Sequence, residues 1–137
     1  MKVAINGCYG GFVLSDKAIE MIMKRKGFDC YRYKWQYQMD KGYKRIDKSD
    51  DKLGLTILYS TVDLGKEIEE IPKENYWYYG NLERTDEDMI AVIEELGDEA
   101  SGACGAVYIV EIPDGVSWEI DEYDGIETIH EVHRKWY

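Results

Sequence analysis

The pair Asp124-Gly125 places the strongest constraint on how this chain folds. A two-residue type I′ turn needs positive φ at both central positions, and Asp-Gly between alternating apolar residues is the strongest short-range signal for such a turn. Val116, Trp118 and Ile120 supply that alternation before the pair. We therefore predict that the chain closes with a β-hairpin around Asp124 and Gly125.

The residues after this turn, 126–136, also fit a short helix. Four of them fall at helical spacing: Ile126, Ile129, His130 and His133. We favour the strand because of the turn signal, although periodicity alone leaves both structures open. In either geometry His130 and Arg134, four residues apart, project from one face, so a small basic site ends an acidic half of the chain.

The length of 137 residues predicts a single domain over residues 1–137, large enough to bury about two-thirds of its unfolded surface without added cross-links. The three cysteines lack paired spacing, which argues against a disulfide framework and a closed four-ligand zinc site. Residues 1–6 contain no apolar signal core, and no stretch approaches the roughly eighteen apolar residues of a membrane-spanning helix. We therefore expect free thiols and a cytoplasmic protein that does not enter the membrane.

Charge divides the chain into two halves. Residues 1–60 carry twelve Lys and Arg against seven Asp and Glu, whereas residues 61–137 carry five against twenty-one. So acidic a second half disfavours duplex nucleic acid, because that affinity depends largely on neutralising phosphates. A small phosphate-bearing ligand is still allowed, since one or two well-placed arginines can bind it. Twelve tyrosines and four tryptophans suit stacking on a base or a partner, or a sheet surface that tolerates tyrosine.

The start of the chain predicts a strand, a glycine-rich loop and a helix. Residues 1–6 form the strand, residues 7–14 form the loop, and Ser15 caps a helix over 16–26 that Gly27 ends. A strand, loop and helix N-terminus in this order can cradle an anion. The loop lacks the spacing and the lysine of a nucleotide P-loop, so a tight connection that needs glycine is the alternative.

The middle of the chain predicts strands. Aromatic and basic residues alternate over residues 28–43, as in a strand with one aromatic face, which we favour over a single-stranded nucleic-acid platform. Residues 44–52 predict a loop, 55–59 a buried strand and 66–73 an acidic connector. The aromatic cluster Tyr76–Tyr79 fits a core, an interface or a ligand platform.

Thr85 is the expected cap of a second helix, whose apolar stripe is a core face. The stripe consists of Met89, Val92, Ile93, Leu96 and Ala100. A near-continuous apolar strand follows over residues 106–112. The resulting order β-α-β-β-α-β-β predicts an α+β domain with a single antiparallel or mixed β-sheet packed against two helices.

Few catalytic constellations are available. Cys8 with His130 or His133 could form a thiol–imidazole pair, but no local signature supports it. His130 and His133 with Glu127 or Glu131 could ligate a metal, but their spacing lacks the glutamate context of the helix-borne zinc motif. We therefore expect a binding protein and not an enzyme, without a cofactor or a bound metal.

Two arginines in the acidic half, Arg84 and Arg134, are not explained by the local composition. Each could pair with nearby carboxylates. If they instead converge with Tyr9 and Phe12 from the glycine-rich loop, they form a pocket with cationic forks and stacking faces. Such a pocket suits a small nucleotide.

Three groups of residues resemble a family of small phage-encoded proteins. They are Cys8-Tyr9-Gly10-Gly11-Phe12 with Leu14-Ser15, then Arg84-x-Asp86 with Glu94-Glu95-Leu96-Gly97 and Ala100-Ser101-Gly102, and last Ile112-Pro113-Asp114, Trp118-Glu119-Ile120, Tyr123-Asp124-Gly125, His133-Arg134 and Trp136. Within that family the chain is similar to the Thoeris anti-defence sponges. The resemblance covers both ends of the chain and residues 84–102, and it is very weak over residues 28–75.

This resemblance implies a phage immune-evasion protein in the cytoplasm of the infected cell. Such sponges sequester the cyclic ADP-ribose isomer made by a bacterial TIR enzyme without cleaving it; some also hold cyclic oligonucleotides and assemble as homo-oligomers. The family's ligand contacts include C-terminal arginines four residues apart, which fall here on His130 and Arg134, so one cation has become titratable. The expected ligand-binding residues are Tyr9, Phe12, Arg84, His130, His133 and Arg134.

Two other functions fit the same sequence. One is an acidic inhibitor, similar in kind to anti-CRISPR proteins, whose acidic half mimics nucleic acid on a host defence protein. The other is a small hydrolase that turns the nucleotide over with Cys8 or a histidine-bound metal.

Overall fold

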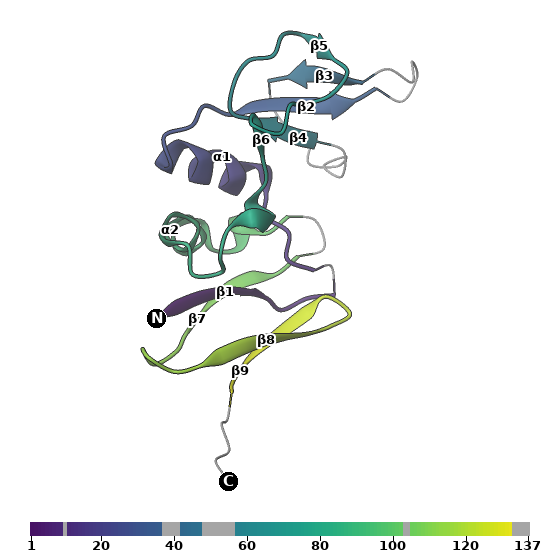
Figure 1. Cartoon of the computed structure of the whole chain (residues 1–137). Coiled ribbons are helices and arrows are strands. Elements are labelled where there is room, and N and C mark those ends of the chain that lie inside the picture. Colours follow the sequence, from purple (N-terminus) through teal and green to yellow (C-terminus); the bar gives the residue numbers. More distant parts are fainter. Residues whose placement is uncertain (10, 37–41, 48–56, 103–104, 133–137) are drawn as a thin grey trace. The chain divides into compact units, whose positions relative to one another are not determined.

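The computed structural model describes residues 1–9, 11–36, 42–47, 57–102 and 105–132 (Figure 1). The chain divides into two compact units. Unit 1 comprises Met1–Ala18 and Glu83–Tyr137, and unit 2 comprises Ile19–Leu82. The division falls within helix α1 (Asp16–Arg25). The expectation of one domain over residues 1–137 stays a prediction.

Unit 1 contains two antiparallel strand pairs and a helix. Strand β1 (Lys2–Asn6) pairs with β7 (Val107–Glu111), and helix α2 (Glu87–Leu96) contacts both strands. A short 3₁₀ helix, η3 (Gly97–Ala100), follows α2. The core of this unit includes side chains of β1 and α2 with 0–3% exposure, and these two elements contact each other. These side chains are Val3, Ala4, Ile5, Met89, Val92 and Ile93.

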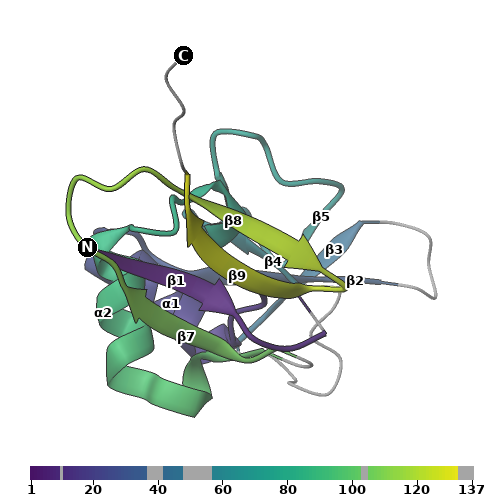
Figure 2. The same cartoon turned by 90° about the horizontal axis from the view of Figure 1, so that it is seen from below.

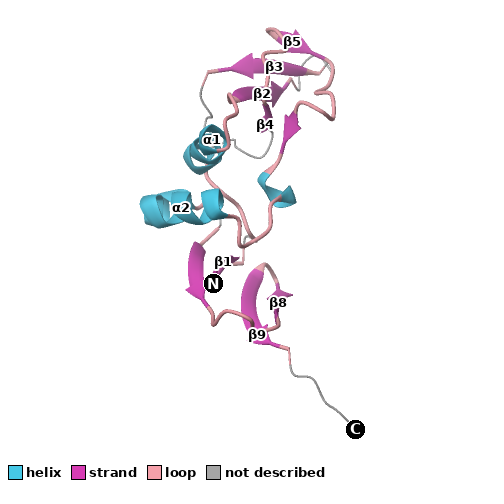
Figure 3. Ribbon diagram, turned by 60° about the vertical axis from the view of Figure 1, so that its left-hand side comes forward, coloured by secondary structure: helices cyan, strands magenta, loops and turns pink. Residues whose placement is uncertain are grey.

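The predicted hairpin is confirmed. Strands β8 (Trp118–Tyr123) and β9 (Ile126–Glu131) pair antiparallel, with Tyr123 opposite Ile126. Asp124 and Gly125 have φ values of 51° and 87°, the positive pair that a type I′ turn requires. The strand is therefore the outcome for residues 126–131, while residues 133–136 lie outside the described ranges. In Figures 2 and 3 the hairpin lies beside β1, and contacts between β9 and β1 join the two.

The helix ends follow local capping rules, with one correction. Ser15 Oγ accepts a hydrogen bond from the backbone N–H of Ala18 (3.2 Å), as predicted for the start of α1. The expected cap of α2 was wrong: Asp86, not Thr85, precedes the helix, and its Oδ1 accepts from the N–H of Met89 at 2.9 Å. A carboxylate bonds this N–H and also interacts favourably with the helix dipole, which the threonine hydroxyl does not.

Unit 2 is built on a five-stranded antiparallel sheet of order β5-β3-β2-β4-β6. Its strands are β2 (Tyr31–Trp35), β3 (Tyr43–Ile46), β4 (Ile57–Ser60), β5 (Glu67–Ile68) and β6 (Tyr76–Trp77). The strand predicted within 28–43 is confirmed as β2 over 31–35, and the strand predicted at 55–59 is confirmed as β4 from residue 57; residues 37–41 and 55–56 lie outside the described ranges. Strand β3 corrects the loop predicted at 44–52 over residues 44–46, and residues 48–52 lie outside the described ranges. Strand β5 corrects the connector predicted at 66–73 over residues 67–68. Strand β5 is the edge strand of the sheet and β3 lies next to it, and short strands with charged residues are common at sheet edges.

The Tyr76–Tyr79 cluster serves core and surface together. Trp77 is 9% exposed, whereas Tyr76 and Tyr78 are more than 40% exposed. The rings of these two tyrosines are nearly parallel, with centroids 6.4 Å apart. The 3₁₀ helix η2 (Tyr79–Asn81) follows.

The α+β class with two helices is confirmed, but the strands form three sheets among the described residues and not one. All pairings between these strands are antiparallel. No helix in the described ranges is long and apolar enough to cross a membrane.

An ion-pair cluster in unit 2 predicts a pH dependence of stability. Glu20 on α1 pairs with Arg32 on β2 and with Lys24 (2.9 Å). Hydrogen bonds from Arg32 first, and then from Lys24, lower the pKa of Glu20 below its ordinary value of 4.5. A lowered pKa in the folded state means that the stabilisation is present above pH 4.5 and disappears as the pH falls through the lowered value.

We therefore expect Glu20→Gln to reduce the free energy of unfolding most at neutral pH, with the loss shrinking below pH 4.5. Urea unfolding of wild type and variant from neutral pH to about pH 3 measures the difference. Glu74→Gln, an exposed carboxylate in the same unit, is the matched control and should show no such trend. A deficit in Glu20→Gln that stays constant with pH would contradict the assignment.

Candidate functional site

Arg84 and Glu127 form a two-pronged ion pair in unit 1. Arg84 Nη1 donates to Glu127 Oε1 at 2.6 Å, and Nη2 donates to Oε2 at 2.8 Å. The Glu127 side chain is 9% exposed and that of Arg84 is 26% exposed. Because the pair is largely removed from water, each charge needs the other to offset the cost of its burial. Arg84 Nη1 also donates to the carbonyl of Ala4 at 3.2 Å, which ties the pair to β1.

Asn6 connects this pair to the hairpin turn. Its backbone N–H donates to Glu127 Oε1 at 2.9 Å, and its side-chain Nδ2 donates to the carbonyls of Gly125 (2.7 Å) and Cys8 (2.5 Å). Its Oδ1 accepts from the N–H of Ala106 at 2.8 Å. Asn6 is fully buried, so each of these bonds satisfies a group that has little access to water. The end of β1, the glycine-rich loop and the turn are therefore held together.

Phe12 from the glycine-rich loop stacks on Arg84. The guanidinium carbon lies 3.7 Å from the centre of the ring, which is a cation–π contact. A guanidinium has five N–H donors, and three of those of Arg84 bond to Glu127 and Ala4. The remaining two, on Nε and Nη2, meet no acceptor among the described residues. Within the described part of the chain, these two N–H groups are the Arg84 donors left for another acceptor.

Tyr9 lies where the glycine-rich loop meets the turn. A Cβ at position 125 would overlap the carbonyl oxygen of Tyr9, so the two backbones pack directly against each other. The Tyr9 residue itself is 71% exposed. Its ring is thus presented to solvent from a backbone that the turn fixes.

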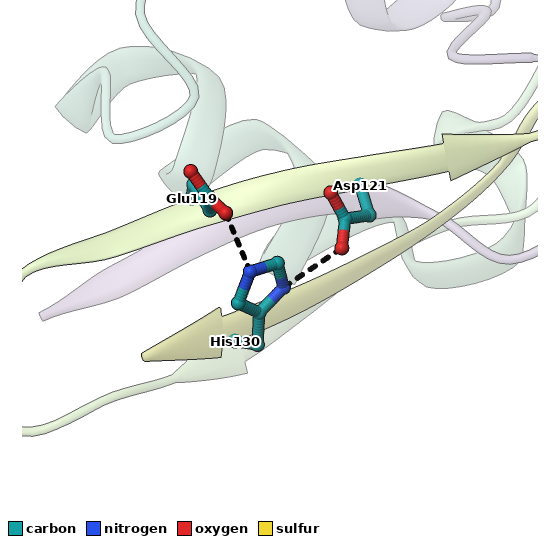
Figure 4. Close-up of side chains that lie close together, drawn as sticks. All are labelled: Glu119, Asp121 and His130. Carbon is teal, nitrogen blue, oxygen red and sulfur yellow. Dashed lines mark hydrogen bonds and ion pairs between the residues drawn. The ribbon is translucent and has the colours of Figure 1, made fainter. Parts of the chain in front are cut away.

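His130 belongs to a different cluster. Residues 127 and 130 point to opposite faces of β9, because side chains alternate along a strand. His130 Nε2 lies 2.6 Å from Glu119 Oε1, and Nδ1 lies 3.0 Å from Asp121 Oδ2 (Figure 4). Ionised carboxylates only accept hydrogen bonds, so only the doubly protonated ring can donate to both.

The structure thus brings together some of the predicted site residues and not others. Phe12 and Arg84 are in contact. The backbone of Tyr9 packs against the turn at Gly125, and Asn6 connects that turn to Glu127, the ion-pair partner of Arg84. His130 lies on the other face of β9, and His133 and Arg134 lie outside the described residues. Glu131 shares the inward face of β9 with Glu127, so neither joins His130 in the metal set that the sequence suggested.

Sequence reasoning missed Asn6 and the role of Glu127 at this site. One signal was available for Glu127. In the predicted strand it shares a face with the apolar Ile129, and a charged residue on an inward face needs a buried partner. Asn6 gave no comparable signal.

Cations are scarce in unit 1. Its described part contains seventeen carboxylates against three Lys and Arg residues, and each of the three is ion-paired. Lys2 pairs with Glu94 at 2.9 Å and Lys17 pairs with Glu99 at 3.4 Å, in addition to the Arg84 pair. The described part of unit 1 therefore carries a strongly negative net charge.

A small apolar pocket lies at the open end of the hairpin. It has a volume of about 140 Å³ and is lined by Ile112, Pro113, Val116, Trp118, Ile129, His130 and Glu131. A cavity of roughly 150 Å³ holds one benzene ring. The pocket is thus too small for a whole nucleotide.

Comparison of the chain with protein-family models, curated proteins and solved structures gives no match.

Proposed function

We propose that this protein binds and sequesters a cyclic nucleotide signal, a cyclic ADP-ribose isomer or a cyclic oligonucleotide, without cleaving it. The proposal places it in the cytoplasm of a phage-infected bacterium, as a homo-oligomer that evades host immunity. One observation carries the proposal: Phe12 of the glycine-rich loop stacks on Arg84, with the guanidinium carbon 3.7 Å from the ring centre, and both residues were singled out from the sequence.

A stacked ring and guanidinium recognise the two parts of a nucleotide by different means. Aromatic faces stack on bases, and the free guanidinium N–H groups donate to phosphate oxygens. Glu127 and Asn6 already hold Arg84 and the loop in place, so little conformational freedom is lost on binding. Tyr9, exposed at the same turn, supplies a further stacking face.

The same geometry limits what Arg84 can contribute. Glu127 already neutralises its charge, so Arg84 offers a phosphate hydrogen bonds but little net attraction. The net positive charge must come from other residues, and His133 and Arg134 are our candidates.

Calorimetric titration of the full chain with glycocyclic ADP-ribose and with cyclic oligonucleotides tests the proposal. We expect binding by the wild type, and Arg134→Ala should weaken it by about 2 kcal/mol through loss of charge-assisted bonds. Phe12→Leu, which keeps an apolar side chain but removes the ring, should also weaken it. Heating the complex and identifying the released ligand separates storage from hydrolysis. An absence of binding with all of these ligands at micromolar protein would overturn the proposal, and release of a cleaved product would favour the hydrolase.

The charge of unit 1 favours a second function, an acidic inhibitor that occupies a nucleic-acid-binding groove of a host defence protein. Its described part has seventeen carboxylates, and its three cations are already paired. Such a surface complements a basic groove and accelerates association with it. A pull-down from host lysate distinguishes the two functions: a sponge needs no protein partner, whereas a mimic retains one in a salt-dependent manner.

A further inference from the structure

We propose that Glu119, Asp121 and His130 on the β8–β9 hairpin form a binding site for a divalent transition-metal ion such as Zn²⁺. The site lies on the face of the hairpin opposite to Glu127. It is independent of the proposed nucleotide binding.

The hairpin register brings the three side chains together. Glu119 lies directly opposite His130 in the antiparallel pair, and Asp121 follows Glu119 by two residues on the same face. Side chains placed opposite each other have Cβ atoms about 5 Å apart, close enough for their ends to meet. One donor atom from each residue lies within 4.8 Å of the other two. Figure 4 shows both carboxylates directed at the imidazole ring.

The donor set selects the class of ion. One imidazole nitrogen and two carboxylate oxygens match the ligand types that bind Zn²⁺ with three protein groups and a water molecule. Mg²⁺ and Ca²⁺ prefer oxygen ligands alone, so the histidine disfavours them. Two ionised carboxylates balance the charge of a divalent ion, and the ring binds it in the deprotonated form. Glu119 faces Nε2 of His130 and Asp121 faces Nδ1, so an ion bound to one ring nitrogen takes the place of the proton there, and the carboxylate at the other nitrogen turns toward the ion.

The position is rigid and open. Six consecutive residue pairs hold the two strands in register through the site. The side chains are partly exposed, at 57% for Glu119, 68% for Asp121 and 42% for His130, so an ion can enter and keep water ligands. The acidic surface of unit 1 raises the local concentration of cations.

Titration of the full chain with Zn²⁺ alone in a calorimeter tests the site. We expect one ion bound per chain at the hairpin, and at least about tenfold weaker binding in Glu119→Gln and Asp121→Asn. His130→Lys is the decisive variant, because lysine can still pair with both carboxylates but remains protonated and does not bind the metal. It should lose Zn²⁺ binding while keeping the circular dichroism and unfolding midpoint of the wild type.

Two controls separate this site from other ligands of the chain. His133→Gln removes the other histidine, and Glu95→Gln removes an exposed carboxylate on α2 of the same unit. Both should bind Zn²⁺ as the wild type does. With Cu²⁺ as the probe, electron paramagnetic resonance should show nitrogen coupling that is absent in His130→Lys. No measurable Zn²⁺ binding by the wild type, or equal binding by His130→Lys, would overturn the proposal.

Discussion

Replacing Arg84 by alanine is expected to lower the free energy of unfolding by about 3 kcal/mol, one of the two largest effects we foresee in this chain. The substitution leaves the Glu127 carboxylate, 9% exposed, without its cation and without two hydrogen bonds. Removing one partner of a buried pair is more harmful than removing both, because the remaining charge stays out of water. The cation–π contact with Phe12 is lost as well. Urea unfolding followed by circular dichroism measures the change.

Two further variants show whether the buried charge is the cause. The double variant Arg84→Met with Glu127→Leu removes both charges and fills the space, so it should recover much of the lost stability. Lys2→Ala removes a cation from an exposed pair, where both side chains are more than 40% exposed, and should have a much smaller effect than Arg84→Ala. Equal losses in Lys2→Ala and Arg84→Ala would show that burial of the Arg84 pair does not matter.

Local signals predicted the elements that local chemistry determines. The turn at Asp124 and Gly125 and the start of α1 at Ser15 were found because a few adjacent residues set their backbone angles and hydrogen bonds. Strands β3 and β5 were missed because short charged strands carry little apolar periodicity. Their pairing depends on residues elsewhere in the chain.

The division into separate sheets could not be predicted either, because strand pairing depends on residues far apart in the chain. Strand β1 finds its partner β7 about a hundred residues later, and no pattern within either strand specifies that partner. The contacts in the candidate site also join residues that are far apart in the sequence. Arg84 stood out as an isolated cation, but its partner Glu127 is 43 residues away, and the two carboxylates that contact His130, Glu119 and Asp121, come from β8. The sequence identified Arg84 and His130 as candidates, but their partners are known only from the fold.

The second large effect concerns the turn itself. Gly125→Ala is expected to lower the free energy of unfolding by about 3 kcal/mol, from backbone strain at positive φ together with overpacking. Gly125 has φ of 87°, and an added Cβ would overlap the Tyr9 carbonyl oxygen and lie 2.6 Å from the amide nitrogen of Gly11. These neighbours are backbone atoms, so no side-chain rotation can relieve the contact. The loop that carries Tyr9 must move away from the turn.

Matched variants at Gly115 separate the two causes. Gly115 also has positive φ, 77°, but a Cβ there has nothing within 4 Å among the described residues. Gly115→Ala should therefore cost only about 1 kcal/mol, the strain of the backbone angle alone. Asparagine tolerates positive φ better than alanine, so Gly115→Asn should be nearly neutral while Gly125→Asn stays destabilising. If the variants at the two positions behaved alike, the glycine-rich loop would not rest on the turn, and the turn would not fix the backbone of Tyr9.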